Sequence, residues 1–377
     1  MKRALGSVRA LSVAIACIAG SLFSHPAGAS ALGDLAASMA PGTFAELTGM
    51  GGWSSGAILS PTDLGCITSD YITQYAEKAP WDPVGKRVMF VGQTHGNCYG
   101  GRFVIYGDST NAWSQGPWPS AICQSGTATS PCFSHAYDHN TVDPATGDLY
   151  YRNYSSTTFL RFRNGSWSSL PAPAMQAVQC CGALEFFPDM SRLIFVDGDW
   201  GVWAFNPSSS AWTLLANTNG SNAGSSLPKL PMSSTAVFAL YDPVLKIVLF
   251  GGGSNLYKLS ASGTITTLKT PPMSLGVTNA VVAVDSTGGK YIVLSGSSMW
   301  QYDASTDTWT QLAITVPSVL LALNGVGDGL VETSISTYGV IMYTKYDNGS
   351  SKVYLYKHSP TAAVQVKPMP PTSVVAQ

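Results

Sequence analysis

A repeating unit of short strands and turns limits what this chain can fold into more than any other feature. Each unit contains an apolar strand, a tight turn, a second apolar strand, a strand with tyrosine, and a last strand with the pattern Trp-x-x-Leu. The most complete copy has strands at 236–241, 247–250, 256–259 and 264–268, with the turn at Asp242-Pro243. Because self-similarity at a fixed period indicates stacked units, the repeat decides how every other residue is interpreted.

The turn after the first strand is the most regular part of the repeat. It occurs at Asp82-Pro83, Asp143-Pro144, Pro188-Asp189, Asp242-Pro243, Asp285-Ser286 and Ser336-Thr337. Asp, Pro and Ser favour tight turns, and the chain also holds 38 glycines and 23 prolines. The fourth-strand signature recurs at Trp167, Trp212 and Trp309. These patterns indicate an all-β chain of short antiparallel strands.

Four short strands in about 45 residues form one blade of a β-propeller. Six pairs of second and third strands can be counted, at 88–92 with 103–106, 149–151 with 158–163, 193–196 with 202–205, 247–250 with 256–259, 291–294 with 299–302, and 340–343 with 353–356. The sequence therefore predicts a six-bladed β-propeller, with seven blades as the alternative. We expect one propeller domain over residues 30–358.

The last unit ends near Tyr356 without a fourth strand of its own. The segment Phe44-Ala45-Glu46-Leu47, near the start of the domain, has the missing pattern. We expect this segment to complete the last blade and close the ring, because an open repeat array would leave exposed sheet edges.

Two segments resemble kelch-type β-propellers, the group that includes the central domain of galactose oxidase. They are Leu249-Phe250-Gly251-Gly252, and Tyr302-Asp303 followed by Trp309. The resemblance covers most of residues 43–357. It implies the architecture, while an activity must be argued from a site.

The first 29 residues have the order of a secretory signal peptide. Three basic residues precede or flank an apolar run from Ala10 to Phe23, and small residues follow up to Ala29. We expect cleavage after Ala29, a secreted or periplasmic monomer, and a disordered tail at 359–377. The mature chain would carry a net charge of −4, which gives no electrostatic reason to bind nucleic acid, and no stretch is long enough for a membrane span.

The mature chain has an even number of cysteines, which in an exported protein favours disulfide bonds over metal thiolates. Six cysteines allow 15 pairings. The pairing we prefer joins Cys66 to Cys98, Cys123 to Cys132, and Cys180 to Cys181. A bridge between adjacent cysteines would be strained, because their Cα atoms are closer than in an ordinary disulfide. It would form a stiff apolar surface on which a sugar ring could rest.

Polar residues gather in the loops that lead into the first strands and in the loops between second and third strands. In a propeller these loops emerge on one face, where binding residues concentrate on a rigid scaffold. The predicted catalytic residues are His95, His135, His139, Tyr154 and Arg152. The predicted substrate-binding residues are Asn140, Trp200, Tyr99, Arg102, Cys180 and Cys181.

Histidine, tyrosine and arginine on one face are similar to the sites of polysaccharide lyases built on propellers, such as ulvan lyases. In a lyase of this kind, His95 or His135 would be the base, Tyr154 the acid, and Arg152 with Asn140 would neutralise a uronate carboxylate. A glycan- or protein-binding propeller is the second hypothesis, and a copper radical oxidase the third. No cofactor is predicted. His135 and His139 lie about 13 Å apart along a strand and cannot share one ion, although one metal ion beside His95 would fit the loop composition.

Overall fold

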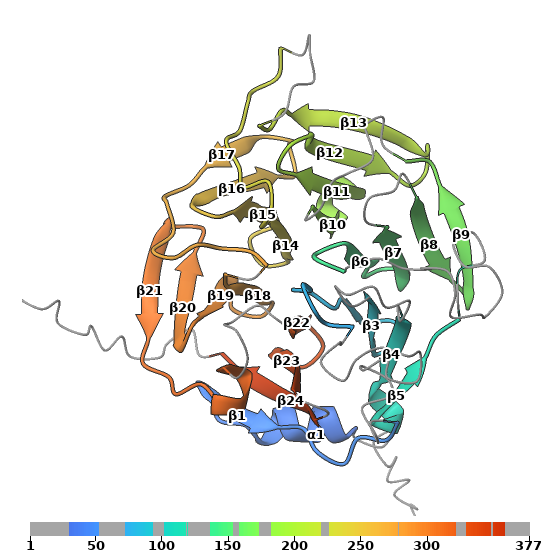
Figure 1. The fold of residues 1–377 in the computed structure, drawn as a ribbon, viewed down its shortest axis with the longest axis vertical. Helices are drawn as coiled ribbons and strands as arrows, with labels where there is room; N and C mark the ends of the chain where they lie inside the picture. The colour runs from blue at the N-terminus through green and yellow to red at the C-terminus, as the bar shows by residue number, and fades with distance from the viewer. Residues whose placement is uncertain are drawn as a thin grey trace, which may run out of the picture.

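The structure is a computed structural model and describes residues 30–52, 72–92, 102–117, 119, 136–153, 158–172, 182–219, 226–277, 279–321, 329–347 and 350–358. These residues form six antiparallel sheets of four strands each, arranged as a ring around a central axis (Figure 1). The fold is therefore a six-bladed β-propeller, as the repeat predicts, and not the seven-bladed alternative.

Each blade follows the predicted order of strands from the axis outward. The first three blades are β2 (Trp81–Asp82), β3 (Arg87–Gly92), β4 (Arg102–Gly107) and β5 (Ala112–Gln115); β6 (Asn140–Asp143), β7 (Asp148–Arg152), β8 (Phe159–Arg163) and β9 (Ser166–Leu170); and β10 (Ala183–Phe187), β11 (Arg192–Asp197), β12 (Gly201–Asn206) and β13 (Ala211–Ala216). The last three are β14 (Phe238–Asp242), β15 (Ile247–Gly252), β16 (Asn255–Ser260) and β17 (Ile265–Thr267); β18 (Val281–Asp285), β19 (Lys290–Ser295), β20 (Ser298–Asp303) and β21 (Thr308–Leu312); and β22 (Leu330–Ile335), β23 (Val340–Asp347), β24 (Ser350–Lys357) and β1 (Thr43–Glu46). Short helical segments lie outside the sheets, at α1 (Ala31–Ser38), η3 (Asp108–Thr110), η4 (Pro188–Met190) and η5 (Ser318–Leu321).

The ring closes through the N-terminal strand, which confirms that prediction. β1 pairs antiparallel with β24, and Phe44 lies opposite Tyr356 in the register. Lys352 Nζ donates to Glu46 Oε1 at 2.6 Å across the same pair. In Figure 1 the blue N-terminal strand lies against the red C-terminal sheet, so the two ends of the domain hold one blade together.

The recurring aspartates explain the regular turns after the first strands. Asp82 Oδ1 accepts the backbone N–H groups of Val84 and Gly85, and Asp242 Oδ1 accepts those of Val244 and Leu245. An Asp side chain that binds the backbone two and three residues later stabilises a tight turn, which is why the turn residue recurs.

Apolar side chains fill the space between adjacent blades. One cluster joins Met89 and Val91 of β3 to Leu149 and Tyr151 of β7, and another joins Ile292 of β19 to its neighbours on the sixth blade. The innermost strand of each blade has one edge that pairs with no other strand, and the backbone N–H groups along that edge require hydrogen-bond acceptors. Polar side chains from neighbouring blades satisfy several of these groups, as described below.

The predicted signal peptide, the C-terminal tail and all six mature cysteines lie outside the described residues. The disulfide pairing therefore stays a prediction. No helix among the described residues is long and apolar enough to cross a membrane.

Candidate functional site

The described members of the predicted site lie at one end of the propeller, which we call the loop end. It is the end where the first strands begin and where second strands connect to third strands. The opposite end, which carries the Asp-Pro turns, is called the turn end. His139, Asn140, Arg152, Arg102 and Trp200 are described and lie at the loop end. Six predicted residues lie outside the described residues, namely His95, Tyr99, His135, Tyr154, Cys180 and Cys181.

The structure brings His139 and Arg152 together. The backbone N–H of Arg152 donates to the carbonyl of His139 at 3.2 Å, because β6 begins where its partner β7 ends. The Arg152 guanidinium carbon lies 4.5 Å from the ring centroid of Phe195, whose ring is also 6.3 Å from that of His139. A cation over an aromatic face is attracted to the ring. Both side chains are buried, with relative exposures of 0% for His139 and 1% for Arg152.

Asp197, at the end of β11, supplies the opposite charge to this group. Burial lowers the pKa of Arg152 to about 10, and the Asp197 carboxylate opposes that shift. Burial raises the pKa of Asp197 to about 6, although Arg152 and two backbone N–H groups stabilise its ionised form. Arg152 therefore stays cationic at neutral pH although it is buried. We call His139, Arg152 and Asp197 the loop-end group.

Asp197 also fixes the loop that carries Trp200. Its Oδ1 accepts the backbone N–H groups of Asp199 and Trp200 at 2.9 and 3.0 Å. The indole N–H of Trp203 donates to the Trp200 carbonyl at 3.0 Å. The predicted stacking residue Trp200 is half-buried and held on a rigid loop directly beside the loop-end group.

Asn140 and Arg102 have structural contacts at the same end. Asn140 Oδ1 accepts from the Val91 N–H at 3.2 Å, and its amide donates to the Val91 carbonyl at 3.0 Å. The side chain thus joins the second blade to the first and satisfies both backbone groups of Val91. Arg102 is buried, and one guanidinium nitrogen donates to Gln115 Oε1 at 3.3 Å.

A buried ion cluster lies between the two ends, near the axis. Lys78 Nζ is 2.7 Å from Asp138 Oδ1 and 2.7 Å from Glu185 Oε2. It also donates to the carbonyls of Leu184 and Ala239 at 2.8 and 3.0 Å. Lys78 reaches the axis from the segment before β2, so one side chain connects the first blade to the third and fourth.

The carboxylates of this cluster accept hydrogen bonds from the free edges of inner strands. Asp138 Oδ2 accepts the Ala239 N–H at 2.8 Å, Glu185 Oε1 accepts the Tyr241 N–H at 3.1 Å, and Glu77 Oε1 accepts the Val282 N–H at 3.3 Å. Burial raises the pKa of Asp138 to about 7 even though Lys78 opposes the shift. Burial also raises the pKa of Glu77 and of Glu332 well above the ordinary value. The cluster therefore holds more acid than its single lysine neutralises.

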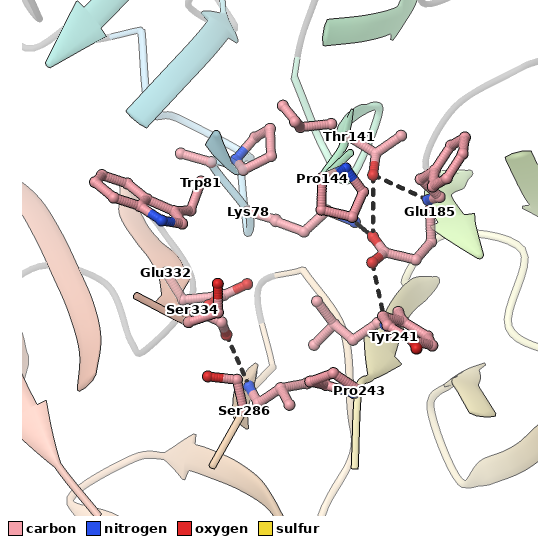
Figure 2. Close-up of a pocket in the computed structure, with 17 residues that line it drawn as sticks. Lys78, Trp81, Thr141, Pro144, Glu185, Tyr241, Pro243, Ser286, Glu332 and Ser334 are labelled. Carbon is pink, nitrogen blue, oxygen red and sulfur yellow. Dashed lines mark hydrogen bonds and ion pairs between the residues drawn. The ribbon is translucent and has the colours of Figure 1, made fainter. Parts of the chain in front are cut away.

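A cavity of 170 Å³ lies on the turn-end side of the ion cluster, and residues of all six blades line it. Figure 2 shows Glu332 and Ser334 on one side of it, Glu185 on the other, and Lys78 between them. The walls toward the mouth are apolar and include Trp81, Pro144 and Pro243. No group of three or more His, Cys, Asp or Glu side chains among the described residues is placed to hold a metal ion.

The ion cluster and the cavity were not predicted from the sequence, although a signal for them exists there. Glu185 and Glu332 stand alone among apolar residues in the strands Ala-Leu-Glu-Phe-Phe and Leu-Val-Glu-Thr-Ser-Ile. A charged residue inside an apolar strand is seldom fully buried unless it is paired, so the sequence predicts a polar or charged partner for each of these residues. Which residue is the partner depends on the ring, and no local pattern contains that information.

The class of protein that the fold defines is a six-bladed β-propeller. No family model matches the chain, and no curated protein matches its sequence. Among solved structures, the chain is similar to a structural genomics protein of unknown function from Bacteroides thetaiotaomicron, with 12% identity over 77% of this chain and 72% of that one and a TM-score of 0.48. It is also similar to virginiamycin B lyase from Staphylococcus aureus in complex with quinupristin, with 12% identity over 73% of this chain and 78% of that one and a TM-score of 0.43. A streptogramin B lyase is similar with 10% identity over 75% of this chain and 94% of that one and a TM-score of 0.44. The six sheets of this chain define its fold, and its function has to be argued from its own residues.

Proposed function

We propose that this protein is a carbohydrate-active enzyme that cleaves a uronate-containing polysaccharide by β-elimination. The observation that carries the proposal is the loop-end group, in which a buried guanidinium, a histidine and a carboxylate meet beneath the face predicted to bind substrate. Arg152 is 1% exposed and cationic at neutral pH, and the half-buried Trp200 is fixed beside it.

The reaction needs three groups. A cation or hydrogen-bond donor neutralises the uronate carboxylate and so acidifies the neighbouring C5 proton. A base takes that proton as the bond from C4 to the leaving oxygen breaks and the C4–C5 double bond forms, and an acid protonates the leaving oxygen. The products are a new sugar end and an unsaturated uronate.

Arg152 fits the first of these roles because it is a buried cation, and electrostatic interactions are stronger in a protein interior than in water. Asn140, which we expected to share this role, uses both amide atoms on Val91, so the proposal assigns neutralisation to Arg152. The base is a histidine of the predicted set. His139 is the member described next to Arg152, while His95, His135 and the acid Tyr154 are assigned from the sequence.

The test is to incubate the mature protein with alginate, pectin, glucuronan, ulvan and glycosaminoglycans and to follow the ultraviolet absorbance of unsaturated uronate. We expect a rise with at least one polymer, and a loss of at least about a hundredfold in Arg152→Gln, His135→Ala or Tyr154→Phe, in the range of removing one acid, base or electrostatic group. His139→Ala needs a matched control, because removing a buried side chain also destabilises the fold. His358→Ala serves, since His358 is a buried histidine on the sixth blade, with contacts to Gln301 and Tyr356.

The outcomes separate the hypotheses. No absorbance rise with any of these polymers would refute the lyase. Retention on an immobilised glycan without turnover would instead favour a binding propeller. Equal activity losses in His139→Ala and His358→Ala would show that His139 acts through stability alone.

A further inference from the structure

The cavity at the turn end is separate from the loop-end group and contains a buried acid with an unused oxygen. Glu332, in the middle of β22, is 1% exposed and lines the cavity. Its Oε2 accepts the Ser334 hydroxyl at 3.0 Å. Its Oε1 is buried and has no hydrogen-bond partner among the described residues. A buried carboxylate oxygen without a donor is costly, so this one is suited to receive a donor from a ligand.

Lys78 and Ser334, the polar neighbours of Glu332 in the cavity wall, do not supply that donor. Lys78 Nζ already contacts two carboxylates and two carbonyls, which exceeds its three N–H groups. The Ser334 hydroxyl donates to Glu332 Oε2 and accepts from the Val284 N–H at 2.9 Å. The unused oxygen is therefore a property of the folded ring and not of one flexible side chain.

The charge around the cavity favours a cation. Three buried acids, Glu77, Asp138 and Glu332, and the partly buried Glu185 surround the buried Lys78. Because Lys78 is occupied by Asp138 and Glu185, an anionic ligand would find no free cation in the described wall. An ammonium group would both donate to Glu332 Oε1 and reduce the excess of acid.

The size and the walls limit what carries that ammonium group. A cavity of about 150 Å³ holds a six-membered carbon ring, and this one measures 170 Å³. Leu240 and Val284 line it on the inner strands of the fourth and fifth blades, and Trp81 lies on the first blade. Such walls fit a short hydrocarbon body and leave no room for a sugar chain.

We propose that this cavity binds the protonated primary amine of a small organic molecule, with the ammonium group on Glu332 and the apolar body against Leu240 and Val284. The site does not depend on the proposed lyase activity, because it lies at the other end of the propeller and shares no residue with the loop-end group.

The experiment is a calorimetric titration of the mature protein with n-butylammonium chloride at pH 8, with sodium chloride at matched ionic strength as the blank. We expect saturable binding below about 50 mM, the range of a site with millimolar affinity. 1-Butanol has the same size and no charge, and it should bind at least tenfold more weakly. Glu332→Gln keeps the shape of the side chain and should weaken n-butylammonium binding at least tenfold.

A second pair of variants keeps the proposal testable if Glu332→Gln does not fold. Ser336 is exposed at the mouth of the cavity, so Ser336→Trp should block entry and abolish binding. Ser262→Trp, on an exposed outer turn away from the cavity, should bind as the wild type does. No saturable binding to the wild type, equal binding of butanol, or unchanged binding to Ser336→Trp would each overturn the proposal.

The pH dependence is a further signature. The groups that face Glu332 are Lys78, Glu77, Asp138, Glu185 and Tyr343. Burial raises the pKa of Glu332, so ammonium binding should release a proton from it and tighten as the pH rises from 6 to 9. Affinity that is independent of pH over this range would contradict the assignment to Glu332.

Discussion

Replacing Lys78 by methionine should destabilise the propeller more than any exposed charge substitution. Lys78 is buried, and its ammonium group is the shared partner of Asp138 and Glu185 at 2.7 Å each. Lys78→Met roughly keeps the length of the side chain but leaves the buried Asp138 carboxylate and the partly buried Glu185 carboxylate without a cation. Breaking a buried ion pair by removing one partner costs about 3 to 5 kcal/mol. We expect a loss of free energy of unfolding in that range at pH 8.

The loss should shrink as the pH falls. Burial already raises the pKa of Asp138 to about 7 in the presence of Lys78, and removing the lysine would raise it further. A carboxyl group whose pKa is raised in the folded state destabilises the fold by an amount that grows as the pH rises from the unfolded to the folded pKa and is complete above the folded pKa. The difference between Lys78→Met and the wild type should therefore be smaller at pH 5.5 than at pH 8.

The assay is urea denaturation monitored by tryptophan fluorescence at both pH values, and Lys246→Met is the matched control. Lys246 is exposed, and its Nζ lies 3.4 Å from Asp189 Oδ1. A surface ion pair of this kind is expected to contribute about 0 to 1 kcal/mol to the free energy of unfolding. Asp138→Asn combined with Lys78→Met should cost less than the sum of the two single changes, because the groups interact directly. If Lys78→Met matched Lys246→Met at pH 8, or lost equal stability at both pH values, the ion cluster would not stabilise the fold as argued.

Three further predictions concern one contact between blades and two contacts between strands of the same blade. Asn140→Ala leaves both backbone groups of Val91 without their side-chain partner and should lower the free energy of unfolding by about 2 kcal/mol or more in urea denaturation. The control Gln311→Ala, at an exposed position, should change it by less than about 0.5 kcal/mol. Equal effects of the two changes would contradict the role assigned to Asn140. Phe44→Ala removes an aromatic ring whose centroid lies 4.8 Å from that of Tyr356 and should lower the melting temperature by several degrees. Glu46→Gln, which weakens the partly exposed ion pair with Lys352, should lower it by less. The reverse order would mean that the ion pair, and not apolar packing, holds the closing strand in the propeller. Gly252→Ala would press a methyl group into the Ala236 carbonyl oxygen and should destabilise by about 1 to 3 kcal/mol, and a neutral result would show that the strands can separate there.

The repeat predicted the fold because each blade is specified locally. Asp82, Asp143 and Asp242 bind the backbone of their own turns, and the alternation of apolar residues decides which faces pack against neighbouring blades. The closing strand was predictable for the same reason, since Phe44-Ala45-Glu46-Leu47 has the pattern that the last unit lacks. Kelch membership is a finer question, and the kelch resemblance stays a prediction.

The candidate site was predictable only in part. His139 and Arg152 were predicted at one end of the propeller because the loops before first strands and the loops between second and third strands emerge on the same face. The structure brings the two residues together through the pairing of β6 with β7. Asp197 was not assigned to Arg152, because the two residues come from different blades and meet only across the packing of one blade on the next. Asn140 was predicted to contact substrate, but its bonds to Val91 arise from a neighbouring blade that its own sequence does not reveal.

The sequence by itself determined the strand order within a blade and the strand that closes the ring, because these depend on turn chemistry and on apolar alternation within about 45 residues. It predicted six blades with seven as the alternative, and the structure decided for six. Only the tertiary structure decided what lies on the axis. Lys78, Asp138, Glu185 and Glu332 are up to 254 positions apart in the chain, yet the ring places them within one buried cluster. When the ring closes, the unpaired edges of the six innermost strands face one another across the axis. Their buried polar groups must therefore form hydrogen bonds with one another or with a ligand.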